Sequence, residues 1–318
     1  MSKLTREEKV IRYHAIYDQI YSNPRIHVHE ISKNLKIARN TVSSYLDEMY
    51  ESGILFGPEL RLKFYSGLNR YMYLVKFDDP YEAFDQLQRD PRVTFASMYF
   101  GDWNIMLTSD ADYEISHISG FENLLYKGRR YDIITPRTQL RDWKTSFQKM
   151  RQEISEFSPG NIEDPDFVTR SPPDWDEEEW TLFYEYQHDF RKKVTPVLRK
   201  HLVSSDKFYR WMATLPDSTN VIMRFYADGV GSYTHFGFFF RTMYAETVIS
   251  ILSNLPTTIS SIYVEGGLVT TLSIKSDMSS TFLNLFTTIH KMRTMSIVEK
   301  FNQAIGTISY VEAEEEED

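Results

Sequence analysis

The segment HEISKNLKIARNTVSSYLDEMYESGIL, residues 29 to 55, decides the fold of the N-terminal part of the chain. It opens with two apolar residues one helical turn apart, Ile31 and Leu35, and a polar break follows around Ile37. A second apolar stripe then has i, i+4, i+7 spacing and consists of Val42, Leu46 and Met49. With a preceding helix over residues 4 to 21, the pattern predicts three short helices around one apolar centre, as in a helix-turn-helix.

The outer face of the second helix in this segment carries the predicted reading surface. If the apolar stripe faces inward, polar side chains remain near the helix N-terminus, where a recognition helix meets base edges. Arginine and asparagine can form paired hydrogen bonds with guanine and adenine, whereas lysine and serine suit phosphate oxygens. The predicted DNA-binding residues are Lys33, Lys36, Arg39, Asn40, Thr41, Ser43 and Ser44.

Residues in and around this helix include features that favour DNA binding and features that oppose it. The following stretch, GILFGPELRLKFYSG, has a glycine stop and two extended pieces around Gly57-Pro58, which predict the hairpin of a winged helix-turn-helix. Asp47 and Glu48 on the helix oppose strong DNA binding. Ala38 occupies the expected N-cap, where Ser, Thr, Asp or Asn would contribute about 1 kcal/mol.

Composition limits the class of protein. The chain has 318 residues with 42% apolar and 15% aromatic content, enough for about two ordinary domains or four small ones. It has no apolar run long enough for a membrane span, and its charged start lacks the pattern of a signal peptide. The absence of cysteine excludes disulfides, Cys-ligated zinc and iron–sulfur clusters. We therefore expect a cytoplasmic protein.

The charge distribution is uneven. The net charge of −9 counts against a polyanionic partner. The acidic residues, however, concentrate in the segments 174 to 180 and 312 to 318. Residues 1 to 63 hold ten Lys or Arg against eight Asp or Glu, which gives +2. The N-terminal region is therefore mildly basic, which permits DNA binding without proving it.

The chain also resembles itself. Residues 81 to 110 align without gaps with residues 246 to 275, so that Pro91 meets Pro256 and Gly101 meets Gly266. Each copy indicates a strand, a helix, a hairpin that turns at glycine, a second helix (about 113 to 127 and about 279 to 293) and a closing strand. This βαββαβ order is that of a ferredoxin-like sheet with one uncovered face. The uncovered face predicts dimerisation or docking of one copy on the other.

The helical segments upstream of the two copies also align, now at an offset of 166, with Val42 opposite Phe208 and Leu46 opposite Met212. The later segment has Ser204 at its N-cap but a different outer face, with Ser205, Lys207, Tyr209 and Arg210, and we interpret it as degenerate. The predicted fold is α+β, a pair of modules repeated in tandem. The predicted boundaries are a winged helix-turn-helix (1–66), a ferredoxin-like domain (67–145), an acidic, proline-rich linker (146–180), a degenerate winged helix-turn-helix (181–228), a second ferredoxin-like domain (229–311) and an acidic tail (312–318).

The chain resembles the Lrp/AsnC (feast/famine) family of transcriptional regulators in two segments, EISKNLKIARNTVSSYLDEMYESGIL and YMYLVKF…PRVTFASMYFGDWNIMLTSD. The resemblance implies a winged helix-turn-helix followed by a ligand-sensing RAM domain, DNA binding as dimers or higher assemblies, and sensing of amino acids or other small metabolites. It implies ligand-binding residues at the hairpin turn, Gly101, Asp102, Trp103 and Asn104. Asn104 stands where the family usually has Asp, and the matching turn Gly266-Gly267-Leu268 has no polar side chain. Either one copy senses a ligand, or neither does and the pair is a built-in dimer.

Two other functions remain open. Siroheme decarboxylases resemble the same two-module plan, so a tetrapyrrole enzyme is one alternative. Its candidate proton carriers would be His117, His235 and His290, although each could also be a surface or helix-cap histidine without a catalytic role. The other is an interaction or metabolite-sensing protein that has lost DNA binding. The pair His27 and His29 lies where a helix should begin, so we expect no metal site there. Without a P-loop, dinucleotide fingerprint, nucleophile elbow or HExxH motif, we expect no enzyme and no cofactor.

The leading hypothesis is therefore a prokaryotic transcriptional regulator. It binds double-stranded DNA through the first helix-turn-helix, and it associates with itself through the RAM-like sheets.

Overall fold

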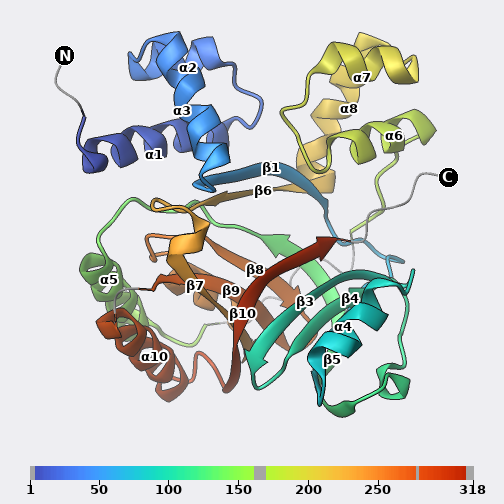
Figure 1. Ribbon diagram of the computed structural model, residues 1–318, viewed down its shortest axis with the longest axis vertical. Helices are drawn as coiled ribbons and strands as arrows, with labels where there is room; N and C mark the ends of the chain where they lie inside the picture. The colour runs from blue at the N-terminus through green and yellow to red at the C-terminus, as the bar shows by residue number, and fades with distance from the viewer. Residues whose placement is uncertain (1–3, 161–169, 277–278, 313–318) are drawn as a thin grey trace.

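The computed structural model describes residues 4–160, 170–276 and 279–312. Two helical units lie on one side of a β-barrel, and a two-stranded ribbon lies between them and the barrel (Figure 1). We call the helices α1–α3 the first head and α6–α8 the second head. The helices of the first head are α1 (Arg6–Ser22), α2 (Val28–Leu35) and α3 (Arg39–Glu51); those of the second are α6 (Glu177–Tyr186), α7 (Val194–His201) and α8 (Ser205–Ser218).

Local sequence explains how the first head folds. A capping box starts α1, because the Thr5 hydroxyl accepts from the Glu8 backbone N–H and the Glu8 carboxylate accepts from the Thr5 N–H. Lys36 adopts the left-handed conformation (φ 54°) and turns the chain from α2 into α3. The predicted apolar stripe is buried as expected, and the core of this head includes Ile31, Val42, Leu46 and Met49.

The ribbon corrects the expected wing. Instead of turning at Gly57-Pro58, residues Leu55–Leu62 form one strand, β1, which pairs antiparallel with β6 (Thr219–Phe225) of the second head. Leu55 packs in the core of the first head, whereas Leu60 and Leu62 pack in the core of the second. The second strand of the wing thus comes from the other head, and this pairing buries apolar side chains at both ends of β1.

Eight strands form the closed barrel in the order β10-β3-β4-β2-β5-β8-β9-β7. The first half of the chain contributes β2 (Tyr71–Phe77), β3 (Val93–Gly101), β4 (Ile105–Ser109) and β5 (Phe121–Ile134). The second half contributes β7 (Tyr233–Arg241), β8 (Ile259–Val264), β9 (Gly267–Lys275) and β10 (Lys300–Glu312). Closure gives each described barrel strand two neighbours, although β5 pairs with β8 only over residues 130–134. The sheet face that was expected to need a partner lines the barrel interior, with Met72, Leu74, Tyr99, Trp103, Met106, Tyr126, Phe239, Val264, Val269 and Ala304 in one cluster.

Helices cover the outside of the barrel. Those packed on it are α4 (Pro80–Gln88), α5 (Trp143–Glu156), α9 (Ala245–Leu252) and α10 (Ser279–Thr294), and α5 lies beside α10 (Figure 1). The helix expected near 279 to 293 is α10. The prediction of a helix near residues 113 to 127 is wrong. A short 3₁₀ turn, η1 (Ile115–His117), lies there instead, followed by Gly120 at φ 74° and then by β5. The positive φ at Gly120 ends any helical run, and β5 instead pairs with β2 and β8.

Two predicted segments lie only partly in the described chain. The expected linker, 146–180, is helical at both ends because α5 reaches Glu156 and α6 begins at Glu177; residues 161–169 lie outside the described residues. Of the expected acidic tail, residues 313–318 lie outside them as well. Among the described residues, no helix combines the length and the apolar character needed to cross a membrane.

Candidate nucleic-acid interface

The seven predicted DNA-binding residues lie together on one continuous surface of the first head. They occupy the last turn of α2, the α2–α3 turn and the first two turns of α3. Lys33, Lys36, Arg39, Asn40 and Ser44 are exposed, whereas Thr41 and Ser43 are half-buried. Among the described residues, none of these seven side chains has a hydrogen-bond or ion-pair partner. Their donors are therefore available to an external acceptor.

The N-terminus of α3 lacks a side-chain cap. Ala38 is the N-cap residue, as predicted, and it provides no acceptor for the first backbone N–H groups of α3. A helix N-terminus with open N–H groups favours a negatively charged oxygen such as that of a phosphate. The missing cap, which weakens the helix in isolation, therefore suits a phosphate-contacting helix.

The acidic residues of α3 are less of an obstacle than the sequence indicates. Lys9 of α1 forms an ion pair with Glu48, with 2.5 Å between Nζ and Oε1. This hydrogen bond lowers the pKa of the Glu48 carboxyl, so it stays ionised and bound to Lys9. Asp47 and Glu51, at the end of the helix, remain exposed without such a partner among the described residues.

The second head presents a different surface at the same positions. Ser204 caps α8 by accepting from the Lys207 N–H, and the Lys207 ammonium is bound by Asp176 and Glu178 of α6. In the α7–α8 turn, Leu202 stands where the first head has Lys36, and it is 90% exposed. Arg210 is exposed, and Tyr209 projects from the helix. At the two compared positions the second head therefore offers a bound lysine and an exposed leucine, although Arg199 and Arg210 nearby are exposed cations.

The two heads contact each other through a reciprocal pair of arginines. The Arg25 guanidinium donates to the carbonyls of Phe190 and Lys192, the latter at 3.0 Å. The Arg191 guanidinium donates to the carbonyls of Pro24 and Ile26, at 2.8 and 2.9 Å. Burial lowers the pKa of both arginines. Each arginine thus bonds the two carbonyls that flank the other, and the pair fixes one head relative to the other.

The first head is also tied to the barrel, through residues 135–138. His14 Nε2 lies 2.9 Å from the Thr138 carbonyl, and the Tyr17 hydroxyl accepts from the Thr138 N–H at the same distance. Burial raises the pKa of Tyr17 to about 12, so the phenol stays protonated. Thr138 in turn shares a hydrogen bond with Thr258, which also bonds the backbone of Phe225 in β6. One segment therefore joins the head, the ribbon and the barrel.

The predicted ligand-binding turn is occupied by contacts within the chain. The Asp102 carboxylate accepts from Asn302 Nδ2 and from the Gln303 N–H, both at 3.0 Å, across the seam between β3 and β10. Trp103 is buried in the barrel interior next to Tyr99, and Gly101 lies so close to Ala304 that a side chain would collide with it. These contacts explain the turn as part of barrel closure, and a metabolite at Gly101 to Asn104 stays a prediction.

Asn104 has a role that the sequence reasoning missed. Its side chain is buried, donates from Nδ2 to the Phe77 carbonyl at 2.7 Å and accepts at Oδ1 from the Phe77 N–H at 2.9 Å. An amide can serve both the N–H and the C=O of Phe77, whereas an ionised carboxylate has no donor. In the sequence, the only sign of this role was that Asn stands where the family usually has Asp. The hydrogen bonds of Asn104 indicate a structural role.

The candidate histidines lie far apart in the fold. His117 lies on η1 and His290 on α10, both exposed. His235 on β7 is half-buried; its Nδ1 lies 2.8 Å from the Ser273 hydroxyl, while Nε2 is buried without a partner among the described residues. Burial lowers the pKa of His235, which favours the neutral ring. His27 and His29 have ring centroids 6.3 Å apart, and no group of three or more potential metal-ligating side chains occurs in the described chain.

Two cavities lie away from both predicted sites. One of about 320 Å³ is lined by Tyr126, Phe239, Arg241 and Glu265, among others, at one end of the barrel. The other, of about 340 Å³, lies beside Lys63, Arg170 and Asp217. Neither is lined by the reading surface or by the turn at Gly101.

Comparison with known proteins identifies the first head. Residues 14–55 match the family model described as winged helix-turn-helix DNA-binding, so this segment is a winged helix-turn-helix. No curated protein matches the chain. The solved structure of the siroheme decarboxylase NirDL is similar at 10% sequence identity and a TM-score of 0.47, covering 93% of this chain and 91% of that one. E. coli AsnC is similar at 14% identity and a TM-score of 0.28, covering 36% of this chain and 87% of AsnC.

Proposed function

We propose that the chain is a DNA-binding transcriptional regulator of the Lrp/AsnC type that reads double-stranded DNA with its first head. The observation that carries the proposal is the state of Arg39 and Asn40. Both are exposed at the start of α3, have no side-chain partner among the described residues, and lie within the segment that matches a winged helix-turn-helix. Lys33 and Lys36 flank them and suit phosphate contacts.

We also infer that the chain is a tandem duplication that builds a dimer within one polypeptide. Three observations support this inference. The element orders of the two halves correspond, apart from the missing helix before β5. Arg25 and Arg191 lie 166 positions apart and contact each other's flanking carbonyls. The two barrel seams, β5–β8 and β3–β10, each join the fourth strand of one half to the second strand of the other. Such reciprocal contacts are those of an isologous, two-fold interface.

The asymmetry of the heads then limits how DNA is read. Because Lys207 is bound by two carboxylates and Leu202 replaces the turn lysine, the second head is expected to contribute little to DNA affinity. One chain therefore reads a single half-site, and two chains are needed for a symmetric operator. We expect assembly of two chains to use the outer faces, since the barrel is closed within one chain.

A small-metabolite effector remains part of this proposal, with the turn at Gly101 to Asn104 as its first candidate position. Isothermal titration with a panel of amino acids, on the wild type and on Asp102→Ala, tests it. Binding that is weakened in the variant supports the site. The absence of heat with every amino acid removes this class of effector.

Binding to the DNA upstream of the protein's own gene tests the main proposal. We expect fluorescence anisotropy to report sequence-preferring binding that weakens as salt increases. The double variant Arg39→Ala, Asn40→Ala loses two base contacts worth about 1–3 kcal/mol each, so its affinity falls by more than roughly tenfold. Arg89→Ala, an exposed arginine on the barrel, is the matched control and binds like the wild type. Equal binding by the double variant would refute the reading surface.

A second candidate, a tetrapyrrole enzyme of the siroheme-decarboxylase kind, rests on His235. Its buried Nε2 has no acceptor or donor among the described residues, so it could serve a bound group. The visible absorption spectrum of the purified protein, before and after addition of an iron porphyrin, decides this alternative. A bound chromophore whose spectrum changes in His235→Gln supports it; an unchanged spectrum with no retained colour rejects it.

A further inference from the structure

Arg130 is a half-buried cation without an ion pair in the described chain. It lies on β5 and its backbone pairs opposite Val264 at the seam with β8. Its Nε is buried and has no hydrogen-bond partner, and its guanidinium forms no ion pair with a described residue. Burying a guanidinium donor without a hydrogen-bond partner is unfavourable.

The charges around Arg130 increase the imbalance. Burial, and then the nearby Arg70 and Arg61, lower the pKa of Arg130 to about 9. Two carboxylates also lie near, those of Asp110 and Asp132, but their effect on Arg130 is smaller. The local field is therefore positive despite the two acids.

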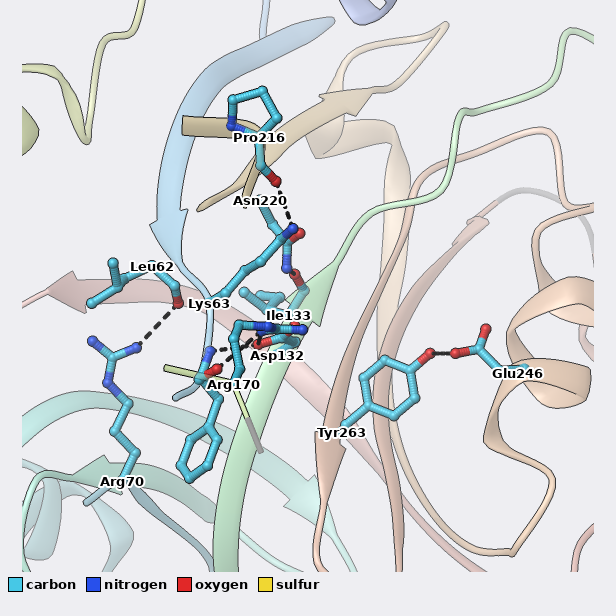
Figure 2. Close-up of polar contacts among 11 residues, drawn as sticks. Leu62, Lys63, Arg70, Asp132, Ile133, Arg170, Pro216, Asn220, Glu246 and Tyr263 are labelled. Carbon is cyan, nitrogen blue, oxygen red and sulfur yellow. Dashed lines mark hydrogen bonds and ion pairs between the residues drawn. The ribbon is translucent and has the colours of Figure 1, made fainter. Parts of the chain in front are cut away.

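Asp132 does not neutralise Arg130 because its oxygens are already used. Figure 2 shows Asp132 beside Arg170, whose Nη1 lies 3.0 Å from Oδ2. Asp132 Oδ1 also accepts from the Phe64 N–H at 2.6 Å. The carboxylate is thus bound to the segment that follows β1.

Arg70, next to Arg130, is a second arginine whose guanidinium makes only long polar contacts. Its carbonyl accepts from the Arg130 N–H at 2.8 Å, so the two backbones are adjacent. Its Nη1 reaches the Leu62 carbonyl only at 3.5 Å, as Figure 2 shows, and its Nε lies 4.0 Å from Asp110, whose side chain is 63% exposed. Both contacts are at the outer limit of useful hydrogen bonds and ion pairs.

We propose that Arg130 and Arg70 together bind the oxyanion group of a small molecule, a carboxylate or a phosphate. Guanidinium forks match the planar or tetrahedral oxygens of these groups, and a pair of them can hold one group from two sides. Asp110 at the rim offsets one positive charge, so the pair carries about one net charge toward the ligand. An anion here would complete the hydrogen bonds that the protein leaves unmade.

The position of this site connects it to the heads. Arg70 contacts Leu62, the last residue of β1, and β1 belongs to the ribbon that supports both heads. An anion bound to Arg70 and Arg130 would therefore link the end of the ribbon to β5 of the barrel. Any effect on DNA binding rests on the function proposed above, whereas the binding of the anion does not.

Thermal unfolding in different sodium salts tests the site without DNA. Phosphate and acetate are compared with chloride at matched ionic strength, which separates specific binding from screening. We expect phosphate or acetate to raise the wild-type midpoint by at least about 2 °C relative to chloride, through mass action on the folded state. The salt that responds identifies the group.

Arg130→Met removes the guanidinium donors and keeps an unbranched apolar side chain that reaches about as far as the arginine Nε. We expect this variant to lose the anion response and, in chloride, to melt no lower than the wild type, because it removes a cation whose buried Nε has no partner. Arg129→Met, an exposed neighbour on β5, is the control and keeps the response. Arg70→Met provides a second test should Arg130→Met fail to fold.

Three results would overturn the site: no anion-specific shift in the wild type, a shift that survives in both Arg130→Met and Arg70→Met, or a lower midpoint of Arg130→Met in chloride. None of them depends on DNA, so a failed DNA-binding proposal and a failed anion site are distinguishable.

Discussion

Arg25 and Arg191 each bond the two backbone carbonyls that flank the other, and this exchange holds the two heads together. Arg25 also lies over the rings of Tyr186, Phe190 and Phe208. The contact buries two cations on neutral acceptors, so it depends on hydrogen-bond geometry and on ring stacking. It gives the first head a fixed orientation above the ribbon.

Removal of one of these arginines should destabilise the protein. Arg25→Ala loses two charge-assisted hydrogen bonds and the ring contacts, so we expect the free energy of unfolding to fall by about 2–4 kcal/mol. Arg191→Ala should cost a similar amount, and the two losses should not add, because each variant already loosens the shared contact. Urea unfolding measures both. Arg89→Ala, which is exposed, is the control, and additive losses would contradict a shared contact.

Asn104 provides a test of the barrel turn. Asn104→Asp restores the residue usual in the family but removes the donor to the Phe77 carbonyl, so we expect a loss of about 1–3 kcal/mol. The buried Asp would resist ionisation, which raises its pKa in the folded state. The loss should therefore be smaller at mildly acid pH, where the carboxyl is protonated, and grow toward neutral pH. Thermal midpoints across pH measure this. Asn123→Asp, exposed on β5, should show neither effect.

Leu202 is strained and exposed in the turn of the second head. It has φ 56° and is 90% exposed, so glycine at this position removes backbone strain without loss of a buried contact. We expect Leu202→Gly to raise the free energy of unfolding by about 0.5–1 kcal/mol, since the gain exceeds the added entropy of the unfolded chain. Lys36→Gly is the matched variant in the first head, at φ 54°, and should gain a similar amount. A loss in both would show that these side chains make contacts of their own.

Glu185 makes the second head sensitive to acid. Its pKa is lowered to about 2 by hydrogen bonds from Lys192, Lys200 and His201. A carboxyl with a lowered folded pKa stabilises the protein fully above its unfolded pKa of about 4.3, and this contribution disappears as pH falls toward 2. Because the group is partly solvated, we expect roughly 1 kcal/mol rather than the full shift.

Glu185→Gln should therefore be less stable than the wild type near neutral pH and equal to it near pH 2. Chemical unfolding at several pH values measures the difference. Glu122→Gln, exposed on β5, is the control. A constant difference at all pH values would show that packing, and not the charge, is responsible.

Local patterns in the sequence predicted the first head but not its surroundings. The spacing of Val42, Leu46 and Met49 sufficed for α3, and Ala38 marked its start, because both signals lie within a few residues. The wing was beyond such reasoning, since the partner of β1 lies more than 150 positions away and nothing in GILFGPELRL selects it. The prediction of a helix after residue 113 was wrong. It was based on the alignment of the two halves, and it neglected Gly120, whose positive φ ends a helix.

At the sites too, the sequence predicted features that depend on local periodicity and missed those that depend on distant contacts. The seven predicted DNA-binding residues could be named because a helix face follows from periodicity. The roles of Asn104 and Arg130 depend on neighbours brought in by barrel closure, which no periodicity encodes. The arginine pair did have a signal, because Arg25 and Arg191 occupy equivalent positions at the repeat offset of 166.

We propose that DNA is read by the first head and not by the second. The most direct measurement compares two double variants on the same DNA by fluorescence anisotropy: Arg39→Ala, Asn40→Ala in α3 and Ser205→Ala, Arg210→Ala in α8. We predict that the first loses more than roughly tenfold in affinity while the second binds within about twofold of the wild type. Equal losses, or a loss confined to the second head, would contradict the account.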